Sequence, residues 1–334
     1  MVFLVPLFFT SVNSELFEFN KMILVYGFAT VITGIWVSRM ILQKKIIFKK
    51  SFLDIPLALF LISQFSSTLL SIDPHTSIFG YYSRFNGGLL STISYLLLYW
   101  AFVSNCEVKD VLNSIKWSLV SGVTISIYGI FEHFGHSFSC LMFLGKFDVS
   151  CWVQKVQERV FATLGQPNWL AAYMAVLIPL TYSLGHSRES GNLQNKNLFY
   201  RFQVKPGMTI LSMLLFLCLL FTQSRSGFLG FLLSFAVFWG MLFIQNRNNP
   251  RPFIKPFLIV NCTLLIVNFI FGSPFPQINK YFSYKSLIAP PSQTPITYNL
   301  SPITSSADGG ISASSDIRKI VWKGAFGIFK HYQF

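Results

Sequence analysis

Residues 159–184 have the sequence RVFATLGQPNWLAAYMAVLIPLTYSL, and they set a pattern that recurs along the chain. Arg159 stands ahead of a Gly-x-Pro turn, and the residues from Trp169 onward are almost wholly apolar. Proline suits the first position of a helix, because the N–H of that position has no partner within the helix. We therefore predict that a helix begins at Pro167 and that its positive dipole end, Asn168 and Arg159 face one membrane surface, an arrangement that suits an anion. The alternative is an ordinary interfacial turn whose arginine snorkels to the lipid headgroups.

The composition of the chain indicates a membrane protein. Hydrophobic residues make up 52% of the 334 residues and charged residues 11%, and the mean hydropathy is +0.53. A soluble domain carries about a quarter charged residues, so that class is excluded. The formal net charge of +14 would suggest nucleic acid as the partner of a soluble protein, but these basic residues lie between apolar runs, which is typical of membrane topology. We predict a polytopic, all-α integral membrane protein with the lipid bilayer and no nucleic acid as its partner.

Eight apolar runs of low charge are predicted to cross the bilayer as helices. They cover residues 22–42, 52–72, 89–103, 111–131, 169–184, 208–223, 228–244 and 256–271. Residues 1–10 are also apolar, but they are too short to span comfortably and no basic leader precedes them as in a signal peptide. They are either a thin first helix or the continuation of a chain that starts upstream. The sequence thus predicts a bundle of about 8–9 transmembrane helices over residues 1–271, followed by a large outer loop over residues 272–334.

Basic clusters determine the predicted orientation of these spans. Lysine and arginine gather in the loops 44–50, 188–205 and 247–255, and short loops rich in these residues stay in the cytoplasm. Alternation of the spans then puts the loops 73–88, 132–168 and 272–334 on the outer face. The chain is therefore predicted to be a multi-pass protein of the cell membrane.

Four cations share one position in this topology, just before a helix that runs from the outer face inward. They are Lys21, Arg84, Arg159 and Arg225. Arg225 is the clearest case, because Ser224 or Ser226 can cap its helix and no carboxylate lies near it in sequence. Guanidinium groups bind phosphate oxygens in a bidentate manner and stay protonated, so we expect an outward-facing site for a polyanion such as a diphosphate. The alternative is that each cation snorkels to headgroup phosphates.

Four segments carry a resemblance to a known family. They are RVFATLGQPNWLAAYMAVLIPL (159–180), TQSRSGFLGFLLSF (222–235), YYSRFNGG (81–88) and SSDIRKIVWKGAFGIFKH (314–331). They resemble the O-antigen ligase and polymerase superfamily of bacterial envelope glycosyltransferases, which also includes protein O-oligosaccharyltransferases. The resemblance covers most of the chain and does not distinguish between members. It implies transfer of a glycan from a polyprenyl-diphosphate carrier to a hydroxyl acceptor (a glycolipid, glycan or protein) at the outer face of the bacterial cytoplasmic membrane. It implies no metal or other cofactor, and a place in the assembly of surface polysaccharide or glycoconjugate, such as lipopolysaccharide biosynthesis.

The resemblance also implies roles for single residues. Arg159 and Arg225 match the family's diphosphate-binding arginines and are the expected catalytic residues, which stabilise the diphosphate leaving group. Arg318 matches an arginine in the family's loop helix and is expected to bind substrate. The further substrate-binding candidates, all at the outer helix ends, are Arg84, Asn168, Ser224 and Ser226.

The chain departs from the family at its end. The family continues past the point that corresponds to Phe334 into a Gly-rich turn, the rest of the outer loop and further spans. That loop carries the histidine implicated in activating the acceptor, and His331 lies too early to match it. We therefore expect a fragment or a gene product cut short, with the glycosyltransferase activity belonging to the full-length protein.

Other chemistry in the sequence carries less weight. Glu132, His133 and His136 could be imagined as a metal site with nearby cysteines, but histidines beside a helix end are more often surface residues, and no metal is expected. Cys140 and Cys151 both lie outside in the predicted topology, so a disulfide between them is one option. A transporter or lipid-carrier flippase is the alternative function. Transporters tend to have polar groups and broken helices at mid-membrane, whereas these spans are nearly free of charge there, which favours the enzyme.

Overall fold

The computed structural model describes residues 1–10, 12, 15–187, 206–247, 250–275, 277–279, 284, 321–327 and 330. The chain divides into two compact units, Met1–Pro290 and Pro291–Phe334. The helices of the first unit are α1 (Leu4–Leu7), α2 (Glu18–Gln43), α3 (Asp54–Leu69), α4 (Pro74–Phe79), α5 (Leu89–Asn105), α6 (Val108–His133), α7 (Phe138–Leu144), the short 3₁₀-helix η1 (Ala162–Leu164), α8 (Pro167–Ser187), α9 (Pro206–Phe221), α10 (Arg225–Gln245) and α11 (Arg251–Phe271). In the second unit, residues 321–327 are helical. The all-α prediction is confirmed for the described residues.

Four helices of the described residues are long and apolar enough to cross a membrane. They are α2, α6, α10 and the part of α11 from Phe253 to Phe271. The helices α3, α5 and α9 are apolar but shorter, with 16, 17 and 16 residues. These helices support a membrane-embedded protein, while the count of 8–9 spans and the division after residue 271 stay predictions.

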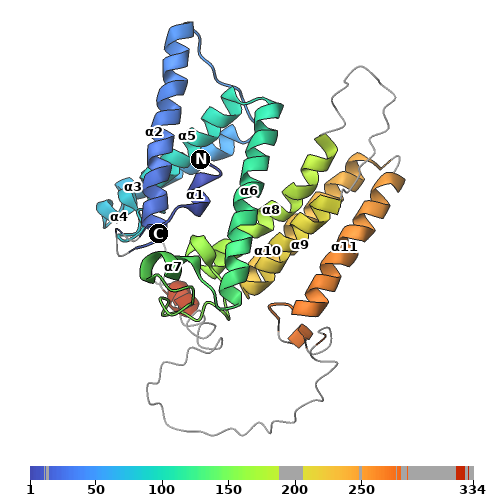
Figure 1. Cartoon of the computed structure of the whole chain (residues 1–334). Coiled ribbons are helices and arrows are strands. Elements are labelled where there is room, and N and C mark those ends of the chain that lie inside the picture. Colours follow the sequence, from blue (N-terminus) through green and yellow to red (C-terminus); the bar gives the residue numbers. More distant parts are fainter. Residues whose placement is uncertain are drawn as a thin grey trace. The chain divides into compact units, whose positions relative to one another are not determined.

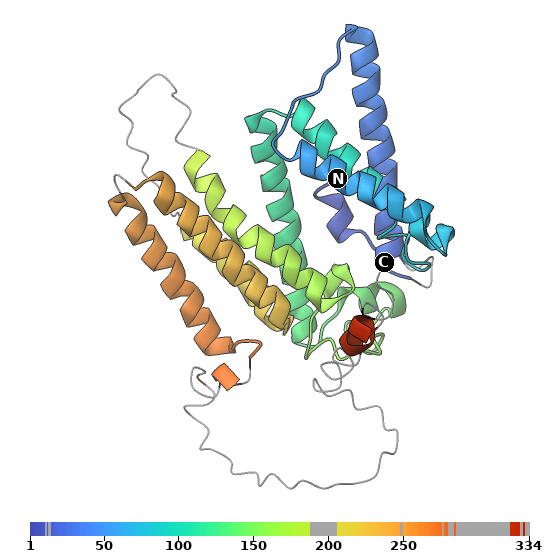
Figure 2. The same cartoon turned by 180° about the vertical axis from the view of Figure 1, so that it is seen from behind.

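The first unit contains two groups of packed helices (Figures 1 and 2). In one group α2 packs against α5, and α3 and α4 lie beside α5. In the other, α8 packs against α9 and α10, while α9 also packs against α6 and α11. The second group holds the main hydrophobic core, to which α6, α8, α9, α10 and α11 all contribute.

The helix predicted from residues 159–184 is the centre of that core. It begins at Pro167, as predicted. Its buried side chains recur at intervals of three and four residues, which aligns them on one face of a helix, and they include Leu170, Met174, Ile178 and Tyr182. The apolar sequence of α8 is therefore used to pack against neighbouring helices.

One break in the backbone of α8 is repaired by its neighbour. Pro179 lies inside the helix, and a proline has no N–H to donate to the carbonyl four residues before it. That carbonyl belongs to Ala175, and the hydroxyl of Ser234 on α10 donates to it over 3.1 Å. In a membrane a freed carbonyl needs such a partner, so this contact lets a proline-containing helix pack tightly against α10.

The smaller elements add detail to the predicted organisation. The only helix within residues 1–10 is α1, which has four residues and a length of about 6 Å, so the thin first helix does not form a span. The loops that follow α3 and α6 contain the helices α4 and α7, which the hydropathy pattern does not predict. Asp73 caps α4 by accepting hydrogen bonds from the backbone N–H and the hydroxyl of Thr76, with Pro74 as the first helical residue.

Candidate anion-binding site at the helix N-termini

The N-terminal ends of α8 and α10 lie side by side. The hydroxyl of Ser224 donates to Oδ1 of Asn168, in the first turn of α8, over 2.8 Å. The same hydroxyl caps α10 by accepting from the N–H of Gly227 at 3.1 Å. A Cβ on Gly227 would come within 2.2 Å of the Cβ of Ala171, so only glycine allows this approach. Two positive helix ends are thus joined through one serine, and of the two predicted capping serines Ser224 is the cap.

The two arginines that the sequence singles out are exposed near this junction. Arg225 is the first residue of α10, and Arg159 precedes a residue, Val160, whose N–H donates to the carbonyl oxygen of Phe221 at 3.1 Å. Phe221 ends α9, four residues before Arg225. Both arginine side chains are exposed, and within the described residues neither has an ion pair or hydrogen bond. Both arginines therefore border the turn between α9 and α10, although no contact joins them.

The other two cations are bound within the protein. The ammonium of Lys21, in the first turn of α2, donates to the carbonyl oxygen of Thr163. Arg84 forms an ion pair with Glu18, with 2.5 Å between Nε and Oε2, and its guanidinium lies 5.5 Å from the ring centre of Trp169. The expectation that Lys21 and Arg84 either bind an anion or snorkel to lipid therefore misses a third role. They join the start of α2 and the loop before α5 to the start of α8.

Several contacts fix the backbone of residues 160–165, the segment after Arg159. Besides the hydrogen bond of Val160, the hydroxyl of Thr163 donates to the carbonyl oxygen of Pro6 at 2.8 Å. Gly165 has a φ of +78° and lies so close to Phe17 that a Cβ would come within 2.6 Å of its ring. Ala162 has a φ of +48°, a left-handed conformation that is uncommon for a residue with a side chain. Such a conformation persists only where the surroundings enforce it, so the backbone behind Arg159 is preorganised.

The enforcing group is Glu132, at the end of α6. Its side chain is fully buried, Oε2 accepts from the N–H of Ala162 at 2.9 Å, and Oε1 accepts from the hydroxyl of Ser137 at 3.3 Å. The adjacent His133 stacks on Phe221 with 3.8 Å between ring centres. The end of α6 therefore supports both segments that carry the exposed arginines.

From the sequence alone, Glu132 and His133 are candidates only for a metal site. The described residues contain no group of three or more His, Cys, Asp or Glu side chains that could hold a metal ion. The signal that identifies Glu132 is its position, since it is a carboxylate at the end of an apolar helix and must find hydrogen-bond donors if it is buried.

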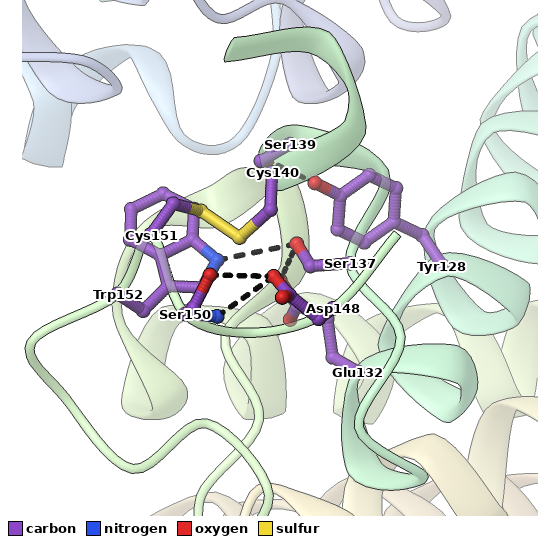
Figure 3. Close-up of a disulfide and its surroundings, with 9 residues drawn as sticks. All are labelled: Tyr128, Glu132, Ser137, Ser139, Cys140, Asp148, Ser150, Cys151 and Trp152. Atoms are coloured by element: carbon purple, nitrogen blue, oxygen red, sulfur yellow. Dashed lines mark hydrogen bonds between the residues drawn. A yellow bond between two sulfur atoms is a disulfide. The ribbon is translucent and has the colours of Figure 1, made fainter. Parts of the chain in front are cut away.

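A disulfide organises the loop next to Glu132 (Figure 3). Cys140 and Cys151 are bonded to each other, so the option left open by the sequence is realised. The hydroxyl of Ser137 also accepts from the indole N–H of Trp152 at 3.2 Å. The disulfide loop, the buried carboxylate and the Arg159 segment thus form one connected structure. Disulfides persist in oxidising compartments, which agrees with the predicted outer location of this loop.

Some predicted residues contribute less, or lie outside the described part. Ser226 is exposed, with its hydroxyl 3.3 Å from that of Ser224. Arg318 and His331 lie outside the described residues.

Comparison of the chain with known protein families, with curated proteins and with solved structures gives no match.

The chemistry open to this site is the binding of an anion. Helix N-termini offer backbone N–H groups and a positive dipole, and the exposed guanidinium groups of Arg159 and Arg225 add fixed positive charge and bidentate donors. Glu132 is fully buried, so its carboxylate cannot reach a ligand at the surface, and its role is to position the backbone.

Proposed function

We propose that the chain binds the diphosphate of a polyprenyl-linked glycan at the junction of α8 and α10, and that it takes part in the transfer of this glycan to a hydroxyl acceptor. The observation that carries the proposal is the pair of adjoining helix N-termini, with the exposed Arg225 at the start of α10 and the exposed Arg159 next to the turn between α9 and α10. A diphosphate presents several anionic oxygens at the end of a lipid chain, which fits a cationic site at the end of apolar helices in both charge and depth. The resemblance to O-antigen ligases and polymerases points in the same direction.

The proposed setting is a multi-pass bundle of 8–9 spans in the bacterial cytoplasmic membrane, with the site on the outer face. The acceptor hydroxyl attacks the anomeric carbon of the donor, the bond from that carbon to the diphosphate oxygen breaks, and the diphosphate leaves with the bonding electrons. The proton of the hydroxyl passes to a base, which by the resemblance is a histidine of the outer loop. Negative charge grows on the leaving group in the transition state, and preorganised cations stabilise it there.

The test compares the two exposed arginines with a matched lysine. Arg159→Ala and Arg225→Ala are each expected to lower glycan transfer by about 10²–10³, and the lysine variants are expected to recover only part, because an ammonium lacks the guanidinium fork. Lys155→Ala is the control, since Lys155 is an exposed cation of the same loop whose ion pair with Glu158 is exposed. Transfer from a polyprenyl-diphosphate glycan is measured at matched membrane abundance.

Two outcomes would refute the proposal, and a third would favour a different function. Near-normal transfer in both alanine variants would show that the arginines serve topology only. A loss in Lys155→Ala as large as in the arginine variants would mean that general positive charge, and not this site, matters. Movement of the donor across proteoliposomes with no glycan transfer would favour a lipid-carrier flippase.

A further inference from the structure

A cavity of about 800 Å³ lies at the other end of α2 and α5 from the arginine site. It is an open groove lined by α2, α5, the start of α6 and the first two residues of the chain. Most of its lining is apolar, with Ile35 and Trp36 from α2 and Leu98, Ala101 and Phe102 from α5. In a membrane such a space is filled by hydrocarbon. The depth of the cavity and the charge at its mouth indicate which molecule supplies this hydrocarbon.

The cavity has a polar end and an apolar body. Arg39 and Asn105 both line it, and Nη1 of Arg39 donates to Oδ1 of Asn105 at 3.0 Å. Both residues lie at the C-terminal ends of their helices. From Asn105 to Tyr95, which lines the cavity deeper along α5, the helix rises by about 15 Å. This is half of the ~30 Å hydrocarbon core, so the cavity has the depth of a single lipid leaflet.

Positive charge surrounds the polar end. The segment after α2 carries Lys44, Lys45, Lys49 and Lys50. It folds back along the two helices, because the indole N–H of Trp36 donates to the carbonyl oxygen of Ile47 at 2.9 Å and the N–H of Lys49 donates to the hydroxyl of Ser104 at 3.2 Å. These lysines therefore lie at the same end of the helices as Arg39. A juxtamembrane basic segment of this kind attracts anionic lipid.

We propose that this cavity is a binding site for an anionic phospholipid of the cytoplasmic leaflet, with an acyl chain between α2 and α5 and its phosphate at Arg39. The apolar lining requires a hydrocarbon chain, which excludes free phosphate, and the cationic rim selects an anionic headgroup. Arg39 has five N–H donors, and only one of them is needed by Asn105. The site is separate from the arginine pair at the start of α8 and α10, and the proposal does not depend on glycan transfer.

The experiment measures lipid bound to the purified full chain by native mass spectrometry. The protein in mild detergent is mixed with equal amounts of phosphatidylglycerol and phosphatidylethanolamine that carry the same acyl chains. Arg39→Gln removes the charge at the mouth, and the control Lys155→Gln removes an exposed charge in the loop before α8, which does not line the cavity. Ile35→Trp fills the cavity from an exposed position on α2, and Val31→Trp adds the same bulk to the exposed Val31 of that helix, which does not line it.

The wild-type chain is expected to retain phosphatidylglycerol in preference to phosphatidylethanolamine. Arg39→Gln should lower this preference about fivefold, the effect of one basic residue at an anionic membrane surface, while Lys155→Gln should leave it unchanged. Ile35→Trp should reduce binding of both lipids, and Val31→Trp should not. Equal retention of the two lipids by the wild-type chain overturns the headgroup assignment. Equal effects of Ile35→Trp and Val31→Trp, or no effect of either, overturn the cavity as the site.

Discussion

Replacement of Glu132 by alanine should loosen the segment that carries Arg159 without unfolding the bundle. The carboxylate supplies the acceptors for two buried donors, the N–H of Ala162 and the hydroxyl of Ser137, and all three groups are fully buried. In Glu132→Ala both donors lose their partner. Each buried donor left unsatisfied costs about 1–3 kcal/mol. The alanine variant no longer carries the desolvation cost of a buried carboxylate, which offsets part of the cost of the two donors. A net loss of about 2–4 kcal/mol is expected, confined to the local structure.

Glutamine at position 132 separates hydrogen bonding from charge. In Glu132→Gln the amide oxygen can still accept from the N–H of Ala162, and the amide N–H can donate to the Ser137 hydroxyl, which has acceptor capacity left. We therefore expect a loss of about 1 kcal/mol or less. Glu158→Ala is the matched control, because Glu158 is an exposed carboxylate of the same segment, and its removal should change the stability by less than about 0.5 kcal/mol.

Hydrogen exchange measured on peptides that cover residues 160–165 is the assay. A local loss of 2–4 kcal/mol corresponds to an increase of about 30-fold to 1,000-fold in the exchange rate of amides that open locally. Peptides from α9 and α10 should change far less. Unchanged exchange of residues 160–165 in Glu132→Ala would refute the positioning role of Glu132. Equal increases in Glu132→Gln and Glu132→Ala would show that the negative charge, and not the acceptor geometry, holds the segment.

Three further predictions concern the disulfide, the α4 cap and the topology. Reduction of the Cys140–Cys151 bond, or Cys140→Ser with Cys151→Ser, should destabilise the loop by about 3 kcal/mol and raise hydrogen exchange over residues 137–152, whereas a reductant should have no effect on the double variant. Hydrogen bonds from the hydroxyl and N–H of Thr76 lower the pKa of Asp73 below its ordinary value, so the cap of α4 should be fully effective above the ordinary aspartate pKa near 4 and be lost as the pH falls through the lowered value. Exchange of the Gly80 amide reports this loss, and Asp73→Asn should remove the pH dependence. Reporter fusions after residues 50, 203 and 251 should report the cytoplasm and fusions at residues 84, 155 and 292 the outside; a cytoplasmic signal at residue 155 would exclude an outer site at Arg159.

The parts of the fold that depend on local sequence could be predicted. The start of α8 at Pro167 follows from proline chemistry. That a serine caps α10 follows from the preference of serine for that position, whereas the choice of Ser224 over Ser226 comes from the structure. The apolar runs give the long helices, because a helix is the simplest way for a chain to satisfy its backbone in lipid. The short helix α7 could not be predicted in this way, because it lies in a loop closed by the Cys140–Cys151 disulfide, which the sequence gives only as one option.

Which of the four cations are bound within the protein and which stay exposed could not be predicted. Lys21 binds the carbonyl oxygen of Thr163, which is 142 residues away in sequence, and Arg84 pairs with Glu18. Such partners are chosen by tertiary packing, and hydropathy or charge patterns carry no information on it. A position at or near the start of a helix is therefore shared by the four cations, while the availability of the charge is not.

The exposed pair (Arg159 and Arg225) and the bound pair (Lys21 and Arg84) have complementary roles in the proposed anion site. A guanidinium without a partner in the protein can offer all of its N–H donors to a ligand, and the side chains of Arg159 and Arg225 have no ion pair or hydrogen bond among the described residues. A flexible backbone would cost ordering entropy each time a ligand bound. Here the Lys21 and Glu132 contacts with Thr163 and Ala162 fix the backbone beside Arg159 in advance. The buried groups therefore make the exposed ones effective, and a variant that loosens the segment should weaken anion binding even though every guanidinium remains.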